Sequence, residues 1–144
     1  MDTVTEIALE FMKFELTKTQ FEVSQTKSGR EGVDFIIKSI DDKSYNLFFK
    51  TFDADTERSI KISKQDLGEL NDDLLIGLVL LVENEARVLY LIPSKDLLQS
   101  NSNIFINNVV SLIPSLSNWE IKIFSKGLDE LEIYTISNQI EKLR

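Results

Sequence analysis

The sequence predicts one α+β domain, residues 1–144, with a mixed, mainly antiparallel central sheet and helices packed on its faces. Three observations lead to this prediction. The chain has 144 residues, which suits a single hydrophobic core. Segments with the composition of strands cluster in the middle of the chain, whereas helical patterns precede and follow them. No Gly-rich or Ser-rich linker divides the chain, and its two prolines stand at positions 93 and 114.

The first segment predicts a helix over residues 4–17. Apolar residues recur there with the 3.6-residue period of a helix, at Val4, Ile7, Ala8 and Phe11. Thr3 and Glu6 fit a capping box, in which both side chains accept hydrogen bonds from backbone amides at the start of a helix. The run "FEV" (21–23) that follows is expected to be a short extended piece.

Two runs rich in β-branched and aromatic residues come next, "VDFIIKSI" (33–40) and "YNLFFKTF" (45–52). A turn of four polar residues, 41–44, separates them, which predicts an antiparallel hairpin. The run "SIKIS" (59–63) predicts a third, short strand. The following "SKQDLGEL" (63–70) predicts a capped helical turn.

A second hairpin is indicated by two apolar runs around "NEA". The first, residues 74–82, is continuously apolar, so we expect a strand that is covered on both faces. The second is "ARVLYLIP" (86–93), after which a helix is expected over residues 94–100. Further on, the alternating run "NWEIKIF" (118–124) predicts an edge strand, and the end of the chain, from Ser137, predicts a helix.

The composition excludes several classes of activity. The chain has no cysteine and no histidine, which removes disulfides, thiolate and imidazole metal sites and Ser-His-Asp catalysis. Its formal net charge of −8 disfavours a general nucleic-acid binder, because an acidic chain repels phosphate on average. The longest apolar run, residues 74–80, is far shorter than the roughly 20 residues of a membrane span. We therefore expect a cytoplasmic protein without a signal peptide or membrane segment.

The stretch "GREGVDFIIKSIDDKSYNLFFKTF" resembles the core of the PD-(D/E)xK nuclease-like superfamily. In that superfamily a helix precedes a hairpin, an aspartate opens the first strand of the hairpin, and a (D/E)-x-K or Q-x-K triplet lies in the second. The matching residues here are Asp34 and Lys50, sixteen positions apart, and Glu6 or Glu10 matches a helix carboxylate that many members add. The resemblance covers roughly residues 3–65. It implies a restriction-endonuclease-like core and Mg²⁺-dependent phosphodiester hydrolysis.

The triplet departs from the family pattern at its acidic position. Residues two apart on a strand face the same side, so the residue that should pair with Lys50 is Phe48. A phenyl ring offers no oxygen ligand, whereas Mg²⁺ requires hard oxygen ligands, usually including one or two carboxylates. We therefore expect no bound metal and no cofactor. If activity remains, Asp34 is the expected ligand and Mg²⁺ the expected cofactor.

An active site would need a carboxylate from elsewhere. Glu6 and Glu10 lie one helical turn apart, so they are expected to share a helix face and to reach the sheet. Three further carboxylates follow the second strand of the hairpin, in a loop that we expect to be poorly fixed: Asp53, Asp55 and Glu57.

The same residues can also be explained by structural roles alone. Lys50 fits a strand lysine whose charge extends to the sheet edge, or one that ends the strand. Asp34 fits an acceptor of backbone hydrogen bonds after Gly32. Glu6 fits the acid of the capping box.

Three functions therefore stay open. The first is a nuclease-like domain that has lost catalysis and acts as a binding or scaffolding protein. The second is a Mg²⁺-dependent nuclease with a relocated acidic residue. The third is a small acidic immunity or inhibitor protein, because an acidic surface steers basic partners. We expect the partner to be a protein of unknown identity. Binding to nucleic acid and formation of a homodimer also stay open.

Overall fold

The computed structural model describes residues 3–26, 34–99, 102–123 and 125–144, without the side chains of residue 34 and residues 125–127. The chain alternates between strands, α-helices (α) and short 3₁₀ helices (η). In chain order the elements are α1 (Thr3–Lys18), β1 (Glu22–Thr26), β2 (Asp34–Lys38), β3 (Ser44–Asp53), β4 (Ser59–Ser63), α2 (Lys64–Leu67), β5 (Leu74–Val82), β6 (Glu85–Pro93), η1 (Ser94–Leu98), β7 (Phe105–Asn108), η2 (Pro114–Leu116), β8 (Asn118–Lys122), α3 (Ser125–Leu131), η3 (Glu132–Tyr134) and α4 (Ile136–Leu143).

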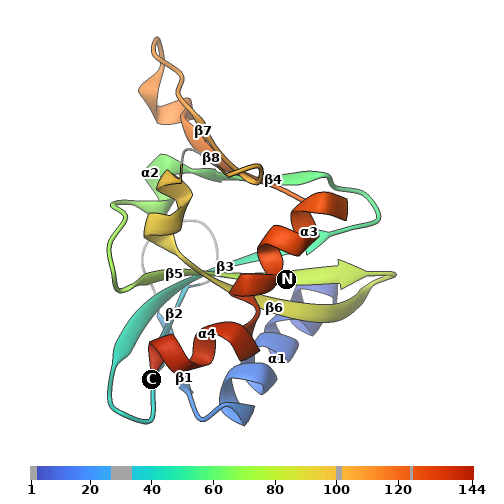
Figure 1. The fold of residues 1–144 in the computed structure, drawn as a ribbon, viewed down its shortest axis with the longest axis vertical. Coiled ribbons are helices and arrows are strands. Elements are labelled where there is room, and N and C mark those ends of the chain that lie inside the picture. Colours follow the sequence, from blue (N-terminus) through green and yellow to red (C-terminus); the bar gives the residue numbers. More distant parts are fainter. Residues whose placement is uncertain (1–2, 27–33, 100–101, 124) are drawn as a thin grey trace.

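The strands form two sheets, which confirms the α+β class (Figure 1). The larger sheet has five strands in the order β1-β2-β3-β5-β6. It is mixed and mainly antiparallel, as expected, because only β3 and β5 pair in parallel. The smaller sheet is antiparallel, with the order β4-β8-β7. No described helix is long and apolar enough to span a membrane.

The larger sheet carries a separate hydrophobic cluster on each face. Successive strand residues point to opposite faces, so neighbours in β3 belong to different clusters. Leu47 and Phe49 pack on the face covered by α1 and α4. Phe48 and Phe52 pack on the other face, which is covered by the smaller sheet and by α3 (Figure 1). Strand β5 lies between the two layers and is buried along its length up to Val82, which confirms the prediction for residues 74–82.

The buried side of α1 differs from the predicted one. The residues of α1 that the sheet covers are Ala8, Leu9, Met12 and Leu16, whereas Ile7 is exposed and Val4 and Phe11 are partly buried. The helix carries apolar residues on more than one side. The one apolar stripe read from the periodicity therefore overlaps the buried side only in part, and packing against the sheet decided which side is covered.

The second half of the chain differs from the expectations in three respects. Strand β8 is the central strand of the smaller sheet, not an edge strand, because β4 pairs with one of its sides and β7 with the other. Strand β7 was not predicted at all, since its sequence, "FINN", is short and has little strand character. The helix expected over 94–100 is the 3₁₀ helix η1. The final helix was predicted correctly and is α4.

Candidate functional site

Asp34, Phe48 and Lys50 occupy one face of the β2–β3 hairpin. The antiparallel register places Asp34 directly opposite Phe48. Directly opposite residues of an antiparallel pair share a face, and so do residues two apart on one strand. Lys50 therefore lies on the same face, one step further along β3. The strand continues to Asp53, so Lys50 does not end it.

Phe48 is part of the core and fills the position at which the sequence resemblance would require an acid. Its side chain is 3% exposed and belongs to the cluster between the two sheets. Lys50 is half-buried, and its ammonium nitrogen lies 5.6 Å from the centroid of the Phe48 ring. The position beside the lysine is thus occupied by an aromatic face, which attracts a cation but cannot coordinate Mg²⁺.

The two helix carboxylates lie away from this face. Helix α1 packs on the opposite side of the larger sheet, against Leu47 and Phe49. Glu6 and Glu10 are both exposed, on the side of α1 that faces solvent. The expectation that they reach the sheet was wrong. A whole sheet layer separates them from Lys50, so neither supplies the missing acid.

The carboxylates at and after the end of β3 are engaged in hydrogen bonds with backbone amides. Asp53 accepts a hydrogen bond from the Asp55 amide at 3.0 Å, and Asp55 accepts one from the Glu83 amide at 2.7 Å. Glu57 accepts a hydrogen bond from the Asp53 amide at 2.9 Å. The three carboxylates thus bind backbone amides of the loop and of the neighbouring β5–β6 turn. Among the residues described, no group of three or more carboxylates gathers closely enough to hold a metal ion.

An open cavity of about 430 Å³ lies beside Lys50. Glu57 from the loop after β3, and Ser59 and Lys61 from β4, line it together with Lys50. This site contains two cations, one carboxylate and hydroxyl groups. It could hold a small anion or an acidic side chain, but it lacks the paired oxygen ligands that Mg²⁺ needs. Sequence reasoning did not include Ser59 and Lys61, because only the folding of β4 over this face brings them near Lys50.

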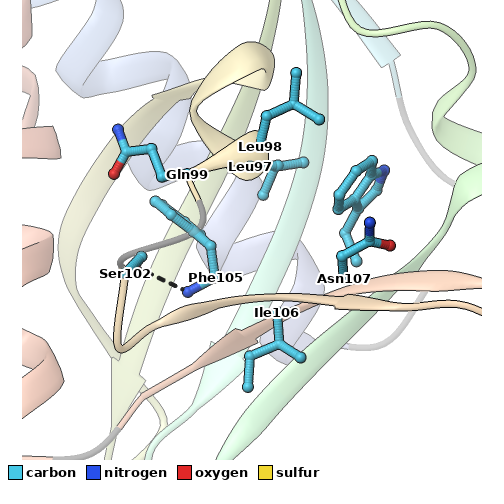
Figure 2. Close-up of a pocket in the computed structure, with 8 residues that line it drawn as sticks. Leu97, Leu98, Gln99, Ser102, Phe105, Ile106 and Asn107 are labelled. Carbon is cyan, nitrogen blue, oxygen red and sulfur yellow. Dashed lines mark hydrogen bonds between the residues drawn. The ribbon is translucent and has the colours of Figure 1, made fainter.

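A second pocket, of about 390 Å³, lies between η1 and the smaller sheet. Figure 2 shows Leu97, Leu98 and Phe105 around it, with Ile106 on the other side of β7. Trp119, from β8, also lines the pocket, and the ammonium nitrogen of Lys64 lies 4.3 Å from the centroid of its ring. This pocket is more apolar than the cavity beside Lys50, which suits an aliphatic side chain.

The chain matches no known protein family, no curated protein and no solved structure in comparisons with each. Its candidate sites must therefore be judged by their geometry and chemistry.

Proposed function

We propose that this protein is a nuclease-like domain that has lost catalysis and acts as a binding or scaffolding protein. The observation that carries the proposal is the buried ring of Phe48, which stands beside Lys50 where a metal-binding acid is needed. Replacing such an acid by a core phenylalanine removes an oxygen ligand and fills the space of the metal. The neighbouring lysine then has no hydrolytic water to orient.

The arrangement of the first half of the chain supports the nuclease-like part of this proposal. A helix, α1, precedes an antiparallel hairpin, Asp34 opens the first strand of the hairpin, and Lys50 lies in the second. Both residues occupy one face, as a site made of an aspartate and a (D/E)-x-K triplet requires. After β3 the chain crosses over, through β4 and α2, to the parallel strand β5.

Plasmid nicking in the presence of Mg²⁺ or Mn²⁺ tests the loss of catalysis. We expect no nicking by the wild-type protein. Lys61→Met is the matched control for Lys50→Met, because both lysines line the same cavity. Nicking that is lost in Lys50→Met and kept in Lys61→Met would establish an active nuclease and overturn the proposal.

Calorimetry with Mg²⁺ provides an independent test of the same proposal. A single carboxylate near a lysine is a poor site for a divalent cation, so we expect no saturable heat at about millimolar Mg²⁺. Saturable binding that disappears in Asp34→Asn and in Glu57→Gln would identify a relocated acid. That result would favour the Mg²⁺-dependent nuclease.

A second candidate function, an acidic inhibitor of a basic protein, is favoured by carboxylates at one end of the larger sheet. Strands β3 and β5 are parallel and begin at the same end, so the turns before them lie together. The backbone amide of Asn46 donates a hydrogen bond to the carbonyl of Asp73 and joins these turns. The exposed acids there are Asp41, Asp42, Glu69, Asp72 and Asp73. Lys38 and Lys95 neutralise part of this charge through ion pairs with Asp42 and Asp72.

Titration with a labelled lysine-rich peptide tests this second function. We expect Asp41→Asn/Asp73→Asn to weaken binding more than Glu10→Gln/Glu83→Gln, which removes the same charge outside these turns, since Glu10 lies on α1 and Glu83 follows the opposite end of β5. Equal effects of the two double variants would mean that only the net charge matters. The acidic end would then not be a binding site.

A further inference from the structure

The hairpin formed by β7 and β8 projects from the body of the molecule and has an apolar tip (Figure 1). Leu112 at the tip is 96% exposed, and Val109 and Leu116 are 66% and 58% exposed. Isolated exposed apolar residues are common, but several on one protruding hairpin mark an interaction surface.

The segment that leads into this hairpin and forms its tip carries no charge of its own, although Lys64 from α2 lies against Asn107 and Trp119. Residues 97–119 contain no Asp, Glu, Lys or Arg, although 28% of the chain is charged. Strand β7 is also an end strand of the smaller sheet. End strands are usually protected from pairing with other chains by charges, prolines or bulges, but the four residues of β7, "FINN", include no charge and no proline.

We propose that this surface binds a second copy of the same chain, with the β7 strands of two copies paired in antiparallel fashion about a two-fold axis. Each copy carries a formal charge of −8, so two copies repel each other over most of their surfaces. The uncharged segment 97–119 is where this repulsion is weakest. Pairing of the two β7 edges joins two three-stranded sheets into one continuous sheet.

The geometry of this pairing also provides a place for the apolar tip. Residues after Asn108 lead to the tip, and residues before Phe105 line the pocket between η1 and β7 (Figure 2). In an antiparallel pair, the chain that leaves one β7 lies beside the chain that enters the other. We therefore expect the tip residue Leu112 of one copy to approach the exposed pocket residue Leu98 of the other.

A two-fold contact of this kind is self-complementary. Each copy contributes one apolar tip and one pocket of mixed polar and apolar lining, so both tips and both pockets are covered at once. Leu98, which is 61% exposed in the single chain, would be buried by the partner copy. A lipid surface is the other occupant that an apolar tip could have, but the chain offers neither basic nor aromatic side chains at the tip to support it.

Sedimentation velocity on matched variants tests the dimer. We expect a dimer at roughly 100 μM wild-type protein, and Leu112→Asp to weaken dimerisation by about tenfold or more. Ile40→Asp is the matched control, because Ile40 is also exposed and the change adds the same charge away from the hairpin. The control should remain dimeric. A monomeric wild type, or equal loss of the dimer in both variants, would overturn the proposal.

Disulfide cross-linking tests the contact between tip and pocket directly. The chain has no cysteine, so Leu98→Cys/Leu112→Cys has no background reaction. Oxidation of this double variant should give a covalent dimer, and a mixture of the two single variants should give the mixed dimer. Cross-linking no faster than in Ile40→Cys/Leu112→Cys would contradict the proposed contact. Co-sedimentation of a monomeric wild type with lipid vesicles would instead assign the tip to a membrane surface.

Discussion

The ammonium nitrogen of Lys50 lies 5.6 Å from the ring centroid of Phe48, two residues earlier on the same face of β3. A cation–aromatic contact at a partly exposed site contributes about 0.5–1 kcal/mol. We therefore predict that Lys50→Met changes the free energy of unfolding by no more than about 1 kcal/mol. Urea denaturation measures this change. A loss above about 2 kcal/mol would show that Lys50 has a larger structural role than this contact provides.

Placing an acid beside Lys50 by Phe48→Glu should destabilise the fold without creating activity. Removing a buried phenylalanine ring costs about 3–5 kcal/mol, and a carboxylate placed in the core loses its hydration as well. Phe14→Glu is the control, because Phe14 is 64% exposed and should tolerate the same change. Thermal melting and plasmid nicking measure the two effects. A stable Phe48→Glu protein that nicks DNA would show that the site needs only this one residue.

Gly77→Ala should strain the contact between β5 and β3. A Cβ atom on Gly77 would lie 3.0 Å from Cδ1 and 3.1 Å from Cγ of Leu47, which is itself buried. Overpacking of this kind costs about 1–3 kcal/mol. Shortening the neighbour by Leu47→Val should relieve the strain, so the double variant should lose less stability than the sum of the two single variants. Strictly additive effects in urea denaturation would contradict this explanation.

The stability of the fold should fall at alkaline pH, in part because of Tyr134. Its hydroxyl is held by burial and by a 2.8 Å hydrogen bond to Asp96, and both raise the pKa of Tyr134 above its ordinary value. The stabilisation is therefore complete below the ordinary tyrosine pKa of about 10. Above it, the unfolded chain loses a proton that the folded chain keeps, so stability declines by up to about 1.4 kcal/mol per pH unit.

Urea denaturation between neutral and strongly alkaline pH checks this expectation for Tyr134. Tyr134→Phe should make the decline shallower. It should not abolish the decline, because burial also raises the pKa values of Tyr45 and Tyr90. An identical pH dependence in wild type and Tyr134→Phe would show that Tyr134 ionises equally easily in both states.

The two hairpins of the larger sheet could be predicted from sequence because their signals are local. Strand composition and a short turn specify the β2–β3 pair, and a continuous apolar run specifies β5 as a strand covered on both faces. The smaller sheet could not be predicted in this way. Its strands β4, β7 and β8 come from distant parts of the chain, and β7 has too few strand-forming residues to stand out.

Sequence alone was enough to predict that positions 34, 48 and 50 share one face, and to show that a phenylalanine stands where the resemblance requires an acid. Both follow from the two-residue period of a strand and the register of one short hairpin. The packing of the whole chain, in contrast, places Glu6 and Glu10 beyond the opposite face and brings Lys61 to the cavity beside Lys50. A helix or a crossing strand can cover either face of a sheet. The choice depends on the burial of apolar surface across the whole chain, and no local sequence pattern encodes that choice.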